Sequence, residues 1–86
     1  MDMDIITVFA SNVKMYRTNR GLSQDKLAEM TGLHRTYISA IECKKRSIAL
    51  ENVQKIADAL AIDTYLLFKP CEGIKTGGKN ESKKKI

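Results

Sequence analysis

Three adjacent side chains in the segment HRTYIS, Arg35, Thr36 and Tyr37, carry hydrogen-bonding groups suited to binding. An Arg guanidinium presents two parallel N–H donors, which match the O6 and N7 acceptors of guanine. A Thr hydroxyl can bond other base edges while its methyl group touches that of thymine, and a Tyr can stack or bond a phosphate. The triplet therefore favours recognition of DNA bases, and the alternative is an ordinary exposed helical turn.

Positive charge is concentrated close to this triplet. The chain carries 15 Lys and Arg against 10 Asp and Glu, a formal net charge of +5, and Lys44, Lys45 and Arg46 are consecutive. Charge sorted in this way steers an anionic partner toward one face. We expect the two lysines to contact phosphates, with a merely solvated loop as the alternative. Arg46 could reach phosphates or enter a minor groove and contact bases.

Further polar side chains could contact the DNA backbone. Gln24 opens a helix, where free backbone N–H groups and the positive end of the helix dipole can hold a phosphate. Capping without DNA contact is the alternative for this residue. We expect five residues in all to contact the backbone: Gln24, Ser39, Lys44, Lys45 and Ser47.

Residues that commonly catalyse reactions or bind metals are few. His34 is the lone histidine and has no Cys or acid at ligand spacing, so a cap or turn role is favoured. Cys43 and Cys71 are too few and too far apart for a disulfide framework or a zinc site, and we expect reduced thiols. The chain also lacks a glycine-rich phosphate loop with a Lys, a nucleophile elbow and paired inward carboxylates. We therefore expect that the protein is not an enzyme and binds no metal and no cofactor.

The elements that must position these residues are helices. Apolar residues recur at helical spacing, and the sequence shows no convincing two-residue alternation. Asp4, Ser23 and Asp63 are expected N-caps, and Gly21 is the expected terminator of the first helix. The prediction is an all-α, compact bundle of five helices, at about Ile5–Asn19, Gln24–Met30, Arg35–Cys43, Leu50–Leu60 and Thr64–Phe68.

The second and third predicted helices match a helix-turn-helix. Such a motif needs a small residue where the helices cross, at Ala28, and a Gly where the chain reverses, at Gly32. Its apolar contacts would come from Leu27, Leu33, Ile38 and Ile41. On the third helix these contacts share a face with Glu42, whereas the small residues Thr36, Ser39, Ala40 and Cys43 form the opposite face. That face could lie in a DNA groove without steric obstruction.

Glu42 would be repelled by phosphates if it were exposed on the reading helix. We expect it to turn inward toward Arg17 of the first helix, which makes the pair structural.

The chain divides into two parts. We expect residues 1–68 to form one helix-turn-helix DNA-binding domain and the Lys- and Gly-rich segment 69–86 to be a disordered tail, since it lacks apolar periodicity. That segment holds six Lys and two Glu and so carries +4 of the net charge. No apolar run approaches the roughly 20 residues that span a bilayer. The start MDMDIITVF lacks the basic region of a signal peptide. We expect no membrane contact and a cytoplasmic, nucleoid-associated protein.

The run GLSQDKLAEMTGLHRTYISAIECKKRSIALENVQKIADALAID resembles the helix-turn-helix domains of Cro and the phage repressors, over about Phe9 to Phe68. Its HRTYIS segment is most similar to the restriction-modification controller proteins. The resemblance implies an all-α repressor-like fold, base contacts from the Arg-Thr-Tyr triplet, phosphate binding by Gln24, and DNA contact near the dyad by Arg46. It also implies a buried pair of Arg17 and Glu42. Cys43 and Ala49 depart from the family, which more often has Arg or Gly at the first position and a Ser or Thr cap at the second.

Controller proteins form twofold dimers through their last helices and bind pseudo-palindromic operators, often at two adjacent sites. The resemblance thus implies a homodimer that binds double-stranded operator DNA, regulates its own promoter and controls endonuclease expression. The residues available for the dimer interface form an apolar group: Ile62, Tyr65, Leu66, Leu67 and Phe68. Core packing is the alternative for about half of them.

The same residues are also compatible with other functions. A prophage repressor or an antitoxin-type regulator would read DNA with the same chemistry. A protein-interaction module of the coactivator kind could use the same scaffold without reading DNA. Activation of transcription would need a surface for RNA polymerase, for which Asp25 and Glu29 are candidates, with ordinary solvation as the alternative.

Overall fold

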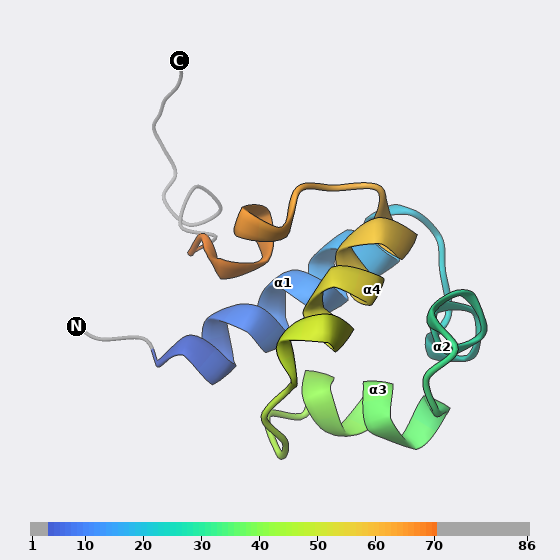
Figure 1. Ribbon diagram of the computed structural model, residues 1–86, viewed down its shortest axis with the longest axis horizontal. Helices are drawn as coiled ribbons and strands as arrows, with labels where there is room; N and C mark the ends of the chain where they lie inside the picture. Colours follow the sequence, from blue (N-terminus) through green and yellow to red (C-terminus); the bar gives the residue numbers. More distant parts are fainter. Residues whose placement is uncertain (1–3, 71–86) are drawn as a thin grey trace.

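The computed structural model describes residues 4–70, which form four α-helices and one short 3-10 helix, with no strand among them. Figure 1 shows α2 and α3 on one side of the molecule and the short helix, η1, beside α1 on the other. The predicted tail lies almost entirely outside the described residues. The bounds of the elements are α1 Ile5–Asn19, α2 Gln24–Thr31, α3 Arg35–Glu42, α4 Leu50–Leu60 and η1 Thr64–Phe68.

Local side-chain chemistry explains where the first two helices begin. The Asp4 carboxylate accepts a hydrogen bond from the Thr7 amide at 2.9 Å, and the Ser23 hydroxyl accepts one from the Lys26 amide at 2.9 Å. Each cap satisfies a backbone donor that has no partner inside the helix. Both predicted caps are confirmed.

The turn between α2 and α3 depends on Gly32. This residue ends α2 with a φ of +76°, in the left-handed region that residues with a Cβ resist. Its amide donates to the Ala28 carbonyl at 2.9 Å, and the Leu33 amide donates to the same carbonyl at 3.2 Å. The predicted reversal is confirmed, and it sets the start of α3.

The fifth predicted α-helix is wrong in type. Residues Thr64–Phe68 form a 3-10 helix, and Asp63 makes no side-chain capping bond there. The Leu66 amide donates to the Asp63 carbonyl at 3.1 Å, a bond that spans three residues. A segment of only 5 residues gains little from α-helical bonds, and the tighter turn is common in short terminal pieces.

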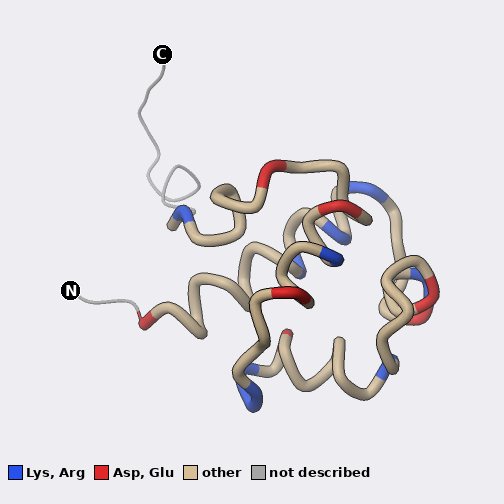
Figure 2. Tube along the Cα trace, viewed as in Figure 1, with Lys and Arg blue, Asp and Glu red and all other residues tan. Residues whose placement is uncertain are grey.

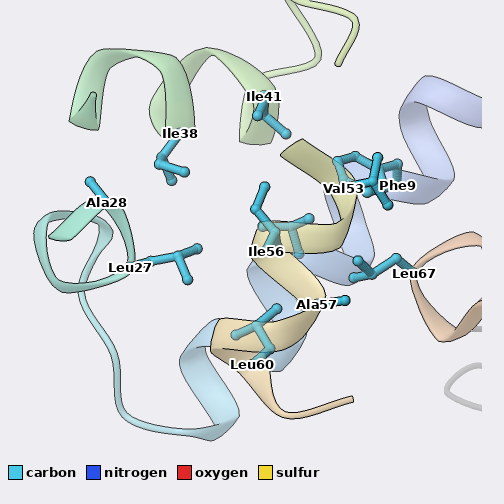
Figure 3. Close-up of a cluster of buried hydrophobic side chains, with 11 residues drawn as sticks. Phe9, Leu27, Ala28, Ile38, Ile41, Val53, Ile56, Ala57, Leu60 and Leu67 are labelled. Atoms are coloured by element: carbon cyan, nitrogen blue, oxygen red, sulfur yellow. The ribbon is translucent and has the colours of Figure 1, made fainter. Parts of the chain in front are cut away.

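One continuous core joins all five elements. Ile38 and Ile41 project from α3 toward Ile56 of α4, while Leu27 approaches from α2 (Figure 3). The side chains of this core are listed together: Phe9, Val13, Leu27, Ala28, Ile38, Ile41, Val53, Ile56, Ala57, Leu60 and Leu67. Because α3 contributes its inward face to this core, the opposite face is held outward.

A buried amide attaches η1 to α1. Asn12 is 1% exposed, and its Nδ2 donates to the carbonyls of Leu67 at 2.8 Å and Lys69 at 2.9 Å. The rings of Phe9 and Phe68 stack nearby, with centroids 5.4 Å apart. These contacts hold the end of the described chain against the first helix. None of the helices within residues 4–70 is long and apolar enough to cross a membrane.

Candidate nucleic-acid interface

The exposed face of α3 carries the predicted reading residues. Arg35 and Thr36 are exposed in its first turn, Ser39 is half-buried, and Cys43 follows its end as an exposed thiol. Figure 2 shows basic residues at both ends of this helix, in its first turn and in the loop that follows it. Small side chains along the middle leave the helix accessible between Arg35 and the basic loop. This arrangement suits a DNA groove flanked by phosphates.

Arg35 forms an ion pair with the preceding helix. Its Nε lies 3.1 Å from Oδ1 of Asp25, and the two side chains are 59% and 79% exposed. An exposed pair of this kind contributes little to stability. The contact engages Nε, whereas the terminal nitrogens are the parallel donors that would meet a guanine.

Tyr37 is half-buried and makes two contacts with other segments. Its Oη accepts a hydrogen bond from Nδ2 of Asn52 at 3.1 Å, and the Arg46 guanidinium carbon lies 5.3 Å from the ring centroid. A cation at this distance over an aromatic face is attracted by the ring. The structure therefore joins two predicted base-contacting residues, Tyr37 and Arg46, which the sequence placed on different segments.

The predicted pair of Arg17 and Glu42 is confirmed. Nε of Arg17 lies 2.7 Å from Oε2 of Glu42, and Nη2 lies 2.9 Å from Oε1. The side chains are only 11% and 3% exposed. The hydrogen bond to Glu42 raises the pKa of Arg17 above its ordinary value, against the opposing effect of burial. The pair fixes α1 to the inward face of α3.

Gln24 contacts this pair. Its Nε2 donates to Oε1 of Glu42 at 3.0 Å, and the side chain is half-buried. The amide is therefore held at the start of α2, near the first turn of α3. Its predicted phosphate contact stays a prediction.

The loop after α3 exposes three of the predicted backbone-contacting residues, Lys44, Lys45 and Ser47. Arg46, a predicted base contact, is exposed in the same loop. Lys44 adopts a φ of +65°, and its amide donates to the Ile41 carbonyl at 3.0 Å, while the Lys45 amide donates to the Ala40 carbonyl at 2.9 Å. These bonds close the end of α3 and turn the basic residues outward.

His34 occupies the N-cap position of α3, but its side chain forms no capping hydrogen bond. Its carbonyl accepts bonds from the amides of Tyr37 at 3.0 Å and Ile38 at 3.2 Å. The predicted place at the start of α3 is confirmed, but the His34 side chain does not cap the helix. Within residues 4–70, no group of three or more His, Cys, Asp and Glu residues could hold a metal ion.

The predicted dimer residues have different environments. Tyr65 is 64% exposed, and Ile62 and Leu66 are half-buried. Leu67 is fully buried, so it is a core residue and has no surface to offer a partner. Phe68 is half-buried and stacks on Phe9 of its own chain.

Sequence reasoning missed Asn52 and Asn12. Both are amides on otherwise regular helices, and each makes its contact with a residue that is distant along the chain. Helical periodicity would mark Asn12 as inward-facing, which is a weak signal for a buried hydrogen bond. Nothing local to Asn52 points to Tyr37.

Two helices that cross about a glycine turn, the second with an exposed Arg-Thr pair, define a helix-turn-helix DNA-binding protein. The chain belongs to the HTH_3 family, described as helix-turn-helix, which matches residues 13–67.

Several known proteins are similar to this chain. The solved structure of a hypothetical transcription factor from Neisseria is 44% identical, has a TM-score of 0.78, and is matched over 83% of this chain and 82% of that one. The control protein C.SmaI of Serratia marcescens is 48% identical over 67% of this chain and 69% of its own length. The restriction-modification controller C.Esp1396I, solved as a tetramer with its natural 35-base-pair operator, is 27% identical with a TM-score of 0.70, over 78% and 88% of the two chains.

Proposed function

We propose that this protein is a sequence-specific DNA-binding transcriptional regulator of the restriction-modification controller type. The observation that carries the proposal is the outward face of α3, with Arg35 and Thr36 exposed in its first turn and a basic loop after its last turn. The similarity to C.SmaI and other control proteins supports the same function. The protein would regulate its own promoter and the expression of a partner endonuclease.

The test of this proposal is selection of DNA by the protein itself. Full-length protein is incubated with a pool of random duplexes, and the retained sequences are compared with a footprint on the DNA upstream of its own gene. We expect one enriched, pseudo-palindromic sequence that also appears in the footprint. A pool without enrichment would contradict the proposal and favour a protein-interaction module.

Arg35→Ala and Lys44→Ala should weaken binding in different ways. We expect Arg35→Ala to lose roughly 1 to 3 kcal/mol of discrimination at one guanine position of the selected duplex, because bidentate base contact is removed. Lys44→Ala should weaken all sequences alike and lower the salt slope by about one, because only a phosphate contact is removed. Titrations at several salt concentrations measure both. If Arg35→Ala kept full discrimination, the role given to this residue would be wrong.

The protein would bind as a homodimer, with two dimers on adjacent sites. C.Esp1396I forms a tetramer on its operator, which supports this arrangement by similarity. A twofold dimer would place the two α3 helices about one DNA turn, roughly 34 Å, apart. A prophage repressor or antitoxin would bind in the same way, and the neighbouring genes would distinguish them: an endonuclease and a methyltransferase favour the controller.

Contact with RNA polymerase would use exposed acids of α2. Asp25 and Glu29 are exposed, and each forms an ion pair, with Arg35 and with Lys26 respectively. Replacing both with the corresponding amides should abolish activation of a reporter promoter; because Asp25 is paired with Arg35, the activity is measured at DNA concentrations that saturate operator binding of the variant. Undiminished activation would remove this surface from consideration.

A further inference from the structure

Tyr37 is restrained from two sides by residues outside its own helix. Asn52, in the first turn of α4, donates its Nδ2 to the Tyr37 Oη at 3.1 Å. Arg46, in the loop between α3 and α4, places its guanidinium carbon 5.3 Å from the ring centroid. The ring itself packs partly against the core. Its direction is therefore set by α4 and by the loop as well as by α3.

The Asn52 contact decides what the Tyr37 hydroxyl can still do. A phenolic hydroxyl carries one hydrogen to donate and an oxygen that accepts. The amide nitrogen of Asn52 only donates, so the Tyr37 oxygen serves as the acceptor in this bond. The hydroxyl hydrogen is then directed to a different acceptor. DNA offers such acceptors in its phosphate oxygens and in the guanine O6, purine N7 and thymine O4 atoms of the major groove.

Neighbouring charge favours the same partner. The Arg46 guanidinium carbon lies 5.3 Å from the centroid of the Tyr37 ring, which places a positive charge next to this side chain. An acceptor with negative charge or partial negative charge is therefore attracted to this position. The half-buried Tyr37 lies on α3 next to Thr36, whose side chain is exposed.

We propose that Asn52 is a positioning residue: its amide orients the Tyr37 hydroxyl so that this hydroxyl donates a hydrogen bond to an acceptor on DNA. The inference rests on the proposed function, because it requires that α3 meets DNA. Asn52 itself touches no base in this arrangement and acts only through Tyr37.

The test is a double-mutant cycle in the full-length protein, with the duplex that the wild-type protein selects from a random pool. Asn52→Asp keeps the size of the side chain but leaves an acceptor, which would draw the hydroxyl hydrogen inward. Tyr37→Phe removes the hydroxyl. We expect each single variant to weaken binding by roughly three- to tenfold, the range for one hydrogen bond. In the Tyr37→Phe background, Asn52→Asp should retain only the smaller effect of its added charge.

A second variant separates positioning from folding. Asn52→Ala removes the donor without adding charge, and thermal unfolding of each variant measures any loss of stability. A merely structural role would lower the Tm and weaken binding equally with Tyr37 or Phe at position 37. Positioning instead predicts a loss that is present with Tyr37 and absent with Tyr37→Phe.

Two further arms identify the acceptor. If it is a base atom, Tyr37→Phe and Asn52→Ala should both lose discrimination at the same base pair when the duplex is altered one pair at a time. If it is a phosphate, both variants should weaken all sequences alike, and a methylphosphonate at one position should reproduce the loss. Either result supports the inference.

The inference is overturned if Asn52→Asp binds as tightly as the wild type, or if Asn52→Ala causes the same loss in both backgrounds. Its failure differs from failure of the proposed function. If only the inference fails, the wild type still selects a sequence and Arg35→Ala still loses discrimination. If the proposed function fails, the wild type selects no sequence, and both proposals fall.

Discussion

The buried contact between Arg17 and Glu42 is the residue-scale feature on which the reading helix depends. The Arg17 Nη1 also donates to the Leu22 carbonyl at 2.7 Å, so the guanidinium is bonded on three nitrogens. A carboxylate on α3 is thereby kept away from the face that carries Arg35. The same pair holds α1, the start of α2 and α3 in one arrangement.

Glu42→Ala should destabilise the fold by about 3 to 5 kcal/mol, because it leaves a buried guanidinium without its counter-charge. Urea denaturation of the full chain measures this loss. The double variant Arg17→Met with Glu42→Leu is the control, and we expect it to be closer to the wild type because no charge remains buried. Equal losses in the single and double variants would show that side-chain packing, and not the ion pair, carries the effect.

The pH dependence of this pair follows from the raised pKa of Arg17. A group whose folded pKa lies above its unfolded value contributes its full stabilisation below the unfolded value. For Arg17 this contribution is therefore present throughout the neutral range and is lost only as the pH rises above the ordinary arginine value. Changes of pH near neutrality should therefore leave the charge of Arg17, and its contribution to the stability of the fold, unchanged.

At the scale of elements, α4 begins without a side-chain cap. Ala49 has the extended backbone of an N-cap residue, with φ −73° and ψ 149°, but no side-chain oxygen to accept a bond. The first turn of this helix nevertheless holds Asn52 beside Tyr37. The first turn of α4 therefore contacts a residue of the candidate interface although this helix lacks a side-chain cap.

Ala49→Thr should stabilise the protein by about 1 kcal/mol, because its hydroxyl can accept a bond from a free amide of the first turn. We expect a Tm increase of roughly 4 to 8 °C, which thermal unfolding by circular dichroism measures. Ala49→Val is the matched control, since it has nearly the same shape and lacks the oxygen. A similar increase in both variants would contradict a capping effect.

At the scale of the whole molecule, η1 carries most of the residues that we propose for a dimer interface. Asn12 and Phe9 hold this segment against α1, and Leu67 fills the core beneath it. Tyr65 is exposed on the same segment. The buried Leu67 thus supports this segment from the core side, and Tyr65 is the one exposed residue of the group that we propose for a dimer.

Tyr65→Ala should weaken dimer formation, because an aromatic side chain that is 64% exposed in one chain would be buried between two. We expect at least a tenfold rise in the dimer dissociation constant, equivalent to about 1.4 kcal/mol. Sedimentation equilibrium measures it. Met30→Ala is the control, since Met30 is also an exposed apolar residue but lies on α2. Unchanged association in the Tyr65 variant would exclude this surface.

Much of the interface was predictable because it depends on neighbours along the chain. Helical periodicity placed Ile38 and Ile41 inward and Arg35 and Thr36 outward, and the structure confirms these positions. The glycine at position 32 predicted the reversal for a steric reason that is local to one residue. These features follow from side-chain type and spacing alone.

The remaining features required the tertiary structure. Asn52 meets Tyr37, and Asn12 meets the carbonyl of Leu67, only because the packed core brings their helices together. The sequence by itself determined the four α-helices, the turn and the face of α3 that carries the predicted DNA-contacting residues. The tertiary structure alone decided which apolar residues of η1 are buried and which side chain orients Tyr37. Those outcomes depend on contacts between residues that are far apart in the chain, and no local pattern records them.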